Sequence, residues 1–313
     1  MAKTEMNAND IIIRDVETKN IMTKSNLPVG GYSVNPYVGC THACKYCYAC
    51  FMKRFTGHTE EWGKFLDVKH WPQIKNPKKF AGQRVVIGSV TDGYNPQEET
   101  FGNTRKLLEQ LRGSGADILI CTKSDLVVRD IDLLQDLGNV TVSWSINTLD
   151  EDFKNDMDCA VSIERRLAAM KRVYEAGIHT VCFVSPIFPG ITDFEAIFER
   201  VKNQCDFFWL ENLNLRDGFK KTIMDYIAEK YSNLLPLYHC IYNEKDHSYF
   251  ETLGKKAEEL AKKYDCPFVD NKLMHGKAKQ GHPIIVKYFY HEEVRGTDNT
   301  GKRNKQNTVG GII

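Results

Sequence analysis

The chain has 313 residues, of which 42% are hydrophobic and 27% are charged, a composition typical of soluble globular proteins. Its formal net charge is +1, so no global field attracts nucleic acid or a membrane, although net charge does not report a local basic groove. We expect no secretory leader, and no apolar run reaches the ~18 residues of a membrane helix, which predicts a cytoplasmic protein without membrane contact.

Residues 1–32 are mostly polar and predict a lead-in segment. Immediately after them, four of the ten cysteines fall within eleven residues, at Cys40, Cys44, Cys47 and Cys50. The other six are scattered singly, which is unlike a small disulfide-stapled scaffold. A tight cysteine cluster in a reducing compartment is more typical of a metal site. Single cysteines in apolar segments, such as Cys121, are expected to be small buried hydrophobes.

From about residue 84 the chain alternates between short β-rich runs and amphipathic helices. Strands are predicted at 84–89, 117–121, 140–146, 179–184 and 206–210. Several of these runs are apolar on consecutive residues, as expected for parallel strands that are covered on both faces. Helices are predicted at 100–112, 163–176, 193–204 and 249–263, where apolar residues recur on one face. This alternation predicts βαβ units and a parallel sheet or barrel of the α/β class.

Two of these helices carry end signals. Ser162 is predicted to cap helix 163–176, and Gly177 to end it. Thr192 and Glu195 have the spacing of a capping box at the start of helix 193–204. The tail from about residue 296 is rich in Gly, Asn, Thr and Lys, and we expect it to be mobile or to become ordered only on a partner.

The sequence Cys40-Thr-His-Ala-Cys44-Lys-Tyr-Cys47 places three thiolates at CxxxCxxC spacing on one loop. Three thiolates can hold a four-iron cubane and leave one iron open to chelate a ligand that carries an amine and a carboxylate. A structural zinc site is the alternative, because Cys50 forms a second CxxC with Cys47. Zinc sites usually add a further ligand pair about 12–20 residues away, and no such cysteine pair follows. Spacing favours an iron–sulfur cluster over zinc but does not decide between them.

The string NPYVGCTHACKYCYA (35–49) resembles the cluster loop of radical S-adenosylmethionine (SAM) enzymes. More narrowly, it is similar to that of the spore photoproduct lyase or DNA-repair-photolyase-like family, and it also resembles the subgroup called radical SAM mobile pair protein B. The segments VTDGYNPQEE (90–99), CTKSDLVVRDIDLL (121–134), RRLAAM (165–170) and PIFPGITD (186–193) resemble further segments of the same family. The matches span roughly residues 33–212 in the expected order.

The resemblance implies a fold and a domain division. The fold is a partial TIM-like (β/α)6 barrel with the cluster loop after the first strand. Active sites of such barrels lie at the carboxyl ends of the strands, which is where the matched motifs fall. We therefore expect a lead-in at 1–32, a radical SAM core barrel at 33–235, and a C-terminal helical extension with a mobile tail at 236–313.

The resemblance also implies roles for individual residues. Cys40, Cys44 and Cys47 are the expected ligands of a [4Fe–4S] cluster. The expected contacts to SAM come from Tyr46, Asp92, Lys123, Ser145 and Arg166. Tyr46 would pack beside the adenine, Lys123 and Ser145 would meet the SAM carboxylate, and Asp92 would take the amino group or a ribose hydroxyl.

Several of these residues have plainer interpretations. Arg166 could contact the SAM carboxylate or support the barrel rim, although an arginine on an amphipathic helix is most often a solvated or salt-bridged face residue. Lys123 could be an ordinary surface lysine, and Ser145 a strand residue satisfied by the backbone. Tyr94 is a weak candidate for a catalytic relay, and packing beside the site is an equal alternative.

The implied reaction is reductive cleavage of SAM to methionine and a 5′-deoxyadenosyl radical, with electrons from a donor such as flavodoxin or ferredoxin. Three functions remain open. The enzyme could act on a nucleic acid or nucleotide, or modify a peptide or protein, with a second radical SAM protein as a possible partner. A non-catalytic zinc or iron–sulfur binding module is the third. Spore photoproduct lyase uses a cysteine hydrogen donor downstream of the cluster, where this sequence has Ser89 and Val90, which argues against thymine-dimer repair.

Overall fold

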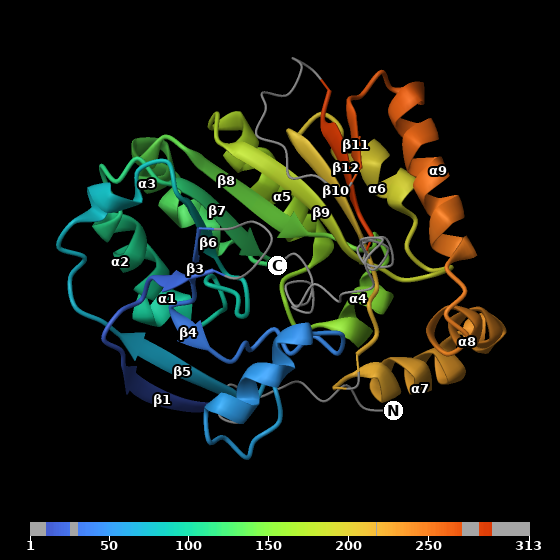
Figure 1. Ribbon diagram of the computed structural model, residues 1–313, viewed down its shortest axis with the longest axis horizontal. Coiled ribbons are helices and arrows are strands. Elements are labelled where there is room, and N and C mark those ends of the chain that lie inside the picture. Colours follow the sequence, from blue (N-terminus) through green and yellow to red (C-terminus); the bar gives the residue numbers. More distant parts are fainter. Residues whose placement is uncertain (1–10, 26–30, 217, 271–281, 290–313) are drawn as a thin grey trace, which may run out of the picture.

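The computed structural model describes residues 11–25, 31–216, 218–270 and 282–289 (Figure 1). The predicted mobile tail therefore lies outside the described residues. Among the residues that are described, no helix combines the length and the apolar character that crossing a bilayer requires.

A nine-stranded sheet forms the centre of the molecule, in the order β11-β12-β10-β9-β8-β7-β6-β3-β2. Its strands are β2 (Thr23–Lys24), β3 (Tyr32–Val34), β6 (Arg84–Ile87), β7 (Asp117–Thr122), β8 (Val140–Ser145), β9 (His179–Ile187), β10 (Phe207–Asn212), β11 (Phe268–Asp270) and β12 (Ile284–Tyr288). All neighbours pair in parallel except β2 and β3, which are antiparallel. The five predicted strands are confirmed as β6 to β10.

Six of these strands, β3 and β6 to β10, follow one another in both chain order and sheet order, as in a (β/α)6 half-barrel. The pairings of the described strands run from β11 to β2 and leave the sheet open. The α/β class and the partial-barrel architecture are therefore confirmed. A separate three-stranded sheet joins β1 (Ile12–Glu17), β5 (Phe65–His70) and β4 (Tyr37–Val38).

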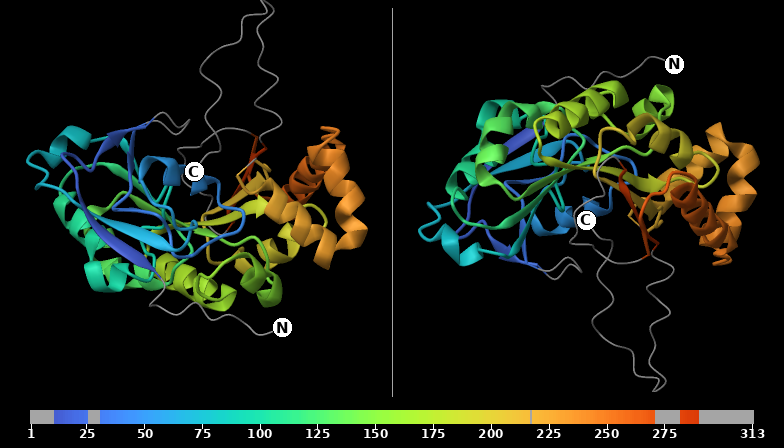
Figure 2. Two further views of the ribbon diagram at one scale, coloured as in Figure 1. Left: turned by 90° about the horizontal axis from the view of Figure 1, so that it is seen from below. Right: turned by 90° about the horizontal axis from the view of Figure 1, so that it is seen from above.

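Helices connect the parallel strands and cover the outer face of the sheet (Figure 2). The α-helices are α1 (Glu98–Phe101), α2 (Asn103–Gln110), α3 (Ile131–Leu137), α4 (Glu151–Met157), α5 (Ile163–Glu175), α6 (Phe194–Val201), α7 (Lys220–Lys230), α8 (Leu235–Tyr242) and α9 (Ser248–Lys263). Short 3-10 helices are η2 (Tyr48–Phe55), η3 (Pro77–Phe80), η4 (Leu126–Asp130) and η5 (Ser232–Leu234). Helices α7 to α9 gather at the end of the sheet where β10, β12 and β11 lie (Figure 1).

The helix end signals are partly confirmed. The Ser162 hydroxyl accepts a hydrogen bond from the backbone N–H of Arg165 at 3.3 Å, and α5 ends just before Gly177, as predicted. The prediction of a capping box that begins at Thr192 is wrong. Asp193 caps α6 instead, because its carboxylate accepts from the Ala196 N–H at 2.9 Å, while the Thr192 hydroxyl donates to the Asn147 carbonyl.

The predicted helix 100–112 is divided. Helix α1 ends at Gly102, which has a φ of +62° and acts as the break before α2. A left-handed residue cannot continue an α-helix, and glycine adopts this conformation without steric cost. The apolar residues that predicted this helix, Leu107, Leu108 and Leu111, all lie after the break and carry no information about it.

The parallel strands bury side chains on both faces, as their continuous apolar sequences predict. One face packs against the helices in the main core, and the other lines a smaller cluster on the inner face that includes Val86, Leu119, Val181 and Trp209. Residues two apart on a strand share a face. The inner face therefore continues from Leu119 to Cys121 on β7 and from Trp209 to Glu211 on β10, at the carboxyl ends of the strands.

The predicted domain boundaries stay a prediction. Strands β1 and β2 and the first residue of β3 lie within 1–32, and β12 lies within 236–313. Strand β12 pairs in parallel with β10, so this part of the C-terminal segment extends the same sheet as the predicted core.

Candidate active site at the carboxyl ends of the strands

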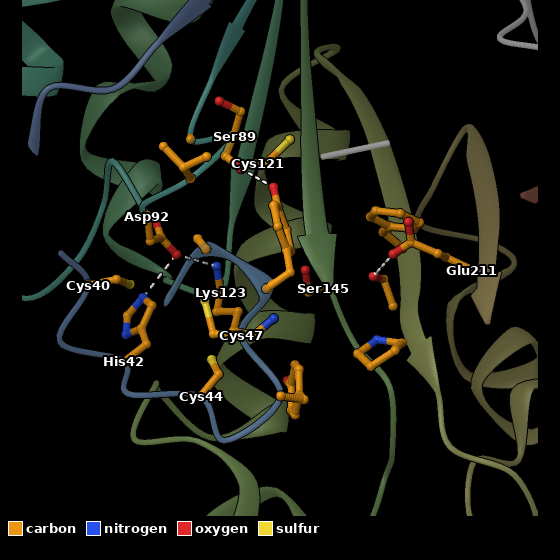
Figure 3. Close-up of a pocket in the computed structure, with 18 of the residues that line it drawn as sticks. Cys40, His42, Cys44, Cys47, Ser89, Asp92, Cys121, Lys123, Ser145 and Glu211 are labelled. Carbon is orange, nitrogen blue, oxygen red and sulfur yellow. Dashed lines mark hydrogen bonds and ion pairs between the residues drawn. The ribbon is translucent and has the colours of Figure 1, made fainter. Parts of the chain in front are cut away.

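A cavity opens at the carboxyl ends of the parallel strands, where barrel active sites are found (Figure 3). Seven of the residues predicted from the sequence line it: Cys40, Cys44, Cys47, Tyr46, Asp92, Lys123 and Ser145. Arg166 and Tyr94 are not among its lining residues. The cavity thus unites the loop after β4 with the ends of β6, β7 and β8.

The cysteine loop is folded by two tight turns. The backbone N–H of Ala43 donates to the Cys40 carbonyl at 3.2 Å, and that of Cys47 donates to the Cys44 carbonyl at 3.1 Å. Ala43 has a φ of +49°, an uncommon conformation for a residue with a side chain. These turns direct the three sulfur atoms of the CxxxCxxC sequence toward one cavity.

Burial disfavours the charged thiolate form of all three cysteines on this loop. Burial raises the pKa of Cys40 and of Cys47 to about 12, and it raises the pKa of Cys44 as well. Lys123 opposes this shift at Cys44. Buried thiols of this kind lose their protons when a cation replaces them, so metal binding and deprotonation are coupled. Thiolates are the ligands that iron–sulfur clusters use.

Cys50 is separate from the other three. It does not line the cavity, and its sulfur lies 4.0 Å from the Tyr48 carbonyl oxygen in a cluster of apolar side chains. Across the residues that the structure describes, no group of three or more His, Cys, Asp or Glu side chains is placed to hold a single metal ion.

Asp92 connects the cysteine loop to the strand ends. Its carboxylate contacts His42 Nε2 at 2.9 Å, and it accepts from the backbone N–H of Lys123 at 2.7 Å, the Tyr94 N–H at 2.8 Å and the Thr122 hydroxyl at 2.9 Å. Burial alone would raise its pKa, but His42 and the donated hydrogen bonds hold the pKa of Asp92 below its ordinary value. This arrangement favours a positioning role for Asp92, and direct contact with SAM remains a prediction.

The Lys123 side chain lies over the ring of Tyr46, which is part of the cysteine loop. The Lys123 ammonium lies 5.5 Å from the centroid of the Tyr46 ring, a cation–π distance. Lys123 lines the cavity and is half-buried, so it is not an ordinary surface lysine. The Tyr46 hydroxyl donates to Asp158 at 3.3 Å. A half-buried cation in the cavity is suited to bind a carboxylate.

Arg166 holds the end of β8, which carries Ser145, without entering the cavity. It is fully buried, it forms an ion pair with Asp158 at 2.7 Å, and it donates to the carbonyl oxygens of Ser145 at 3.2 Å and Val161 at 3.0 Å. The plainer alternative of a salt-bridged arginine therefore holds in part: Arg166 forms an ion pair, but it is buried and not solvated. Of the two predicted roles, the structure favours rim support over contact with SAM.

Tyr94 requires a correction. Its side chain is fully buried in the main core, and its hydroxyl donates to Asp130 at 3.0 Å. It therefore points away from the cavity and is not placed to act as a relay. Tyr94 contacts the site through its backbone N–H, which donates a hydrogen bond to the Asp92 carboxylate.

Several residues that line the cavity received no assigned site role from the sequence, although Ser185 and Glu211 were expected at the ends of their strands. His42 lies inside the cysteine motif and bridges it to Asp92. Tyr48 donates its hydroxyl to the Ser89 carbonyl, and Ser185 donates to Glu211. Cys121 is buried as expected, but it also lines the cavity, and burial raises the pKa of its thiol. The sequence signal for Cys121 was its position two residues after Leu119 on β7, because residues two apart on a strand share a face.

An open parallel α/β barrel with three cysteines lining a cavity at its carboxyl edge has the architecture of a barrel enzyme. The family model of the radical SAM superfamily matches residues 34–201, more than half of the chain. The chain belongs to the radical SAM superfamily, whose members are enzymes that use SAM and an iron–sulfur cluster.

The chain also resembles individual proteins in sequence and one solved structure in fold. An uncharacterized protein of Methanocaldococcus jannaschii is 35% identical over 72% of this chain and 86% of its own length. The radical SAM Nalpha-GlyT isomerase of Pseudomonas phage M6 is 27% identical over 56% of this chain, but only 36% of its own length. A solved spore photoproduct lyase variant with dinucleoside spore photoproduct superposes with a TM-score of 0.56 at 15% identity, covering 88% of this chain and 82% of the other.

Proposed function

We propose that the chain binds a [4Fe–4S] cluster through Cys40, Cys44 and Cys47 and uses it to cleave SAM reductively, with a nucleic acid or nucleotide as substrate. The observation that carries this proposal is that these three cysteines, on one short loop, line the same cavity as Lys123 and Ser145. When bound, the cluster and SAM supply a one-electron cleavage that yields methionine and a 5′-deoxyadenosyl radical.

The residues of the chain have distinct tasks in this proposal. Cys40, Cys44 and Cys47 would hold the cluster through their sulfur atoms, and with three protein ligands a site on the cluster would remain for the SAM amine and carboxylate. Lys123 supplies a cation for that carboxylate, and Ser145, held through its carbonyl by Arg166, supplies a hydroxyl.

Other residues fix the site and keep it dry. His42 and Asp92 hold the cysteine loop against the ends of β6 and β7. Tyr46 and Phe188, whose ring centroids lie 5.5 Å apart, shield it from water.

The substrate part of the proposal draws on the relatives. A spore photoproduct lyase structure contains a dinucleoside spore photoproduct, and the phage relative is named as a Nalpha-GlyT isomerase. Ser89 lines the cavity in the region where the resemblance places a cysteine donor, so we propose a reaction other than thymine-dimer repair. Cys121 of β7, the strand that pairs with β6, lines the same cavity and is the cysteine nearest to that position in sequence. A flavodoxin or ferredoxin is the proposed electron donor, a second radical SAM protein a possible partner, and the cytoplasm the proposed location.

Anaerobic reconstitution with iron and sulfide tests the cluster and the cleavage together. Iron and sulfide are quantified, then dithionite and SAM are added and 5′-deoxyadenosine is measured. We expect cleavage by the wild type and by Cys50→Ala, and none by Cys44→Ala. Equal signals from wild type and Cys44→Ala, or zinc in place of iron in protein purified without oxygen, would refute the assignment.

A further inference from the structure

The cavity extends beyond the cysteine loop to the ends of β9 and β10. Ser185 and Glu211 line it there, and Figure 3 shows Glu211 on the opposite side of the cavity from Cys40 and Cys44. Lys123 and Asp92, which serve the proposed cluster and SAM sites, lie on the cysteine side. The Glu211 side can therefore receive a different ligand.

A buried carboxylate marks the inner end of this region. Glu211 is 5% exposed, and its carboxylate accepts a hydrogen bond from the Ser185 hydroxyl. The next residue, Asn212, also lines the cavity and is 3% exposed. A ligand group that reaches a buried carboxylate must present N–H or O–H donors, because an apolar group would leave the charge desolvated. An amide beside it can pair with both donors and acceptors.

Aromatic side chains form the walls of the same region. Phe183 on β9, Tyr48 on η2 and Phe219 at the start of α7 all line the cavity. Phe183 and Phe219 are buried, and Tyr48 is half-buried. Flat apolar faces of this kind stack favourably on planar rings, and they do so with little preference among bases.

A cation lies at the outer end. Arg216 lines the cavity and is exposed, and among the described residues its guanidinium forms no ion pair with a carboxylate. Most of the other described arginines of this chain pair with Asp or Glu, as Arg165 does with Asp125 at 2.7 Å. A guanidinium that lines a cavity and has no carboxylate partner among the described residues is suited to a phosphate, which it can bind with two parallel hydrogen bonds.

We infer that the Glu211 side of the cavity is a subsite for one nucleotide unit, with its base inserted between the aromatic walls toward Glu211 and Asn212 and its phosphate at Arg216. This inference rests on the proposed function and specifies its substrate class. A peptide could offer N–H donors to Glu211 and a carboxylate to Arg216, but its backbone has no planar ring for the three aromatic walls. The subsite therefore fits a nucleotide better than a peptide.

Binding of small probes tests the subsite without turnover. The four nucleoside 5′-monophosphates, the matching nucleosides and an unstructured octapeptide are titrated by calorimetry into reconstituted wild type, Arg216→Ala and Glu211→Gln. We expect Arg216→Ala to weaken monophosphate binding about tenfold and to leave nucleoside binding unchanged, since one charge-assisted contact is lost. Glu211→Gln should weaken monophosphates and nucleosides alike. Arg54→Ala is the matched control, because Arg54 is exposed but does not line the cavity.

The outcomes separate this inference from the proposed function. Equal monophosphate affinities for wild type and Arg216→Ala, or tighter binding of the octapeptide than of any nucleotide, overturn the subsite. SAM cleavage by the wild type is measured in parallel. Absence of 5′-deoxyadenosine together with Arg216-dependent nucleotide binding would refute the proposed reaction but support the subsite. Because Arg216 is exposed, its substitution tests the inference even if Glu211→Gln fails to fold.

Discussion

The cysteine loop is supported from outside by Gly63, and this contact yields the sharpest prediction. Gly63 has a φ of +100°, and a Cβ atom added to it would lie 2.5 Å from the Ala43 Cβ and 2.9 Å from the Ala43 Cα. Gly57 also has a positive φ, +69°, but a Cβ added there would meet nothing within 4 Å. The two glycines therefore separate backbone strain from steric overlap.

We expect Gly57→Ala to lower the free energy of unfolding by about 1–2 kcal/mol, the cost of a left-handed alanine. Gly63→Ala should lower it by about 2–5 kcal/mol, because overpacking costs about 1–3 kcal/mol on top of the strain. Since Ala43 lies between Cys40 and Cys44, Gly63→Ala should also reduce the iron retained after reconstitution, whereas Gly57→Ala should not.

A second substitution checks the stated cause. Ala43→Gly removes the overlapping Cβ and relieves the φ of +49°, so it should be neutral or stabilising alone and should recover part of the loss in the double variant. Urea unfolding of the metal-free proteins under anaerobic conditions gives the free energy of unfolding of the four members of this double-mutant cycle: the wild type, the two single variants and the double variant. Equal destabilisation by Gly57→Ala and Gly63→Ala, or independent effects of Ala43→Gly and Gly63→Ala, would refute the overlap argument.

Three further predictions concern other residues. Arg166→Met should lower the free energy of unfolding by about 3–5 kcal/mol, because it removes the cation that lies 2.7 Å from the buried Asp158 carboxylate and leaves Lys154, at 3.7 Å, as the remaining ion-pair partner. Burial raises the pKa of Asp158, but Arg166 and neighbouring lysines hold it below its ordinary value, so wild-type stability should be full above that value and decline as the pH falls below it. Tyr94→Phe should cost about 1–2 kcal/mol in thermal or urea unfolding and leave SAM cleavage intact. Cys50→Ala should retain the iron that Cys47→Ala loses, as measured by colorimetric iron analysis.

Each of these has an outcome that contradicts it. A smaller loss for Arg166→Met than for the exposed Arg165→Met would remove the buried-pair argument, and an unchanged acid-side slope of stability in Arg166→Met would remove the pKa argument. Loss of SAM cleavage in well-folded Tyr94→Phe would support the hypothesis that Tyr94 acts as a catalytic relay. Iron loss in Cys50→Ala would make Cys50 a ligand and revive a four-thiolate site.

Local patterns in the sequence predicted the framework of this protein. Continuous apolar runs separated by amphipathic helices predicted the parallel strands β6 to β10. A short run that is apolar on consecutive residues is typical of a strand that is covered on both faces. The CxxxCxxC spacing predicted three cysteines on one loop, since a turn of that length needs no distant contact. The ordered motifs then indicated the radical SAM superfamily, which the family match confirms.

Tertiary structure decided which of the motif residues enter the cavity. Asp92 and Tyr94 are two residues apart, yet the carboxylate of Asp92 binds the cysteine loop while the Tyr94 ring turns into the main core. Glu211 lies far from the cysteines in sequence and joins their cavity only because β6 to β10 align in parallel register. Side-chain direction follows from strand register and packing across the sheet, which depend on contacts between distant segments and which local sequence specifies only in part.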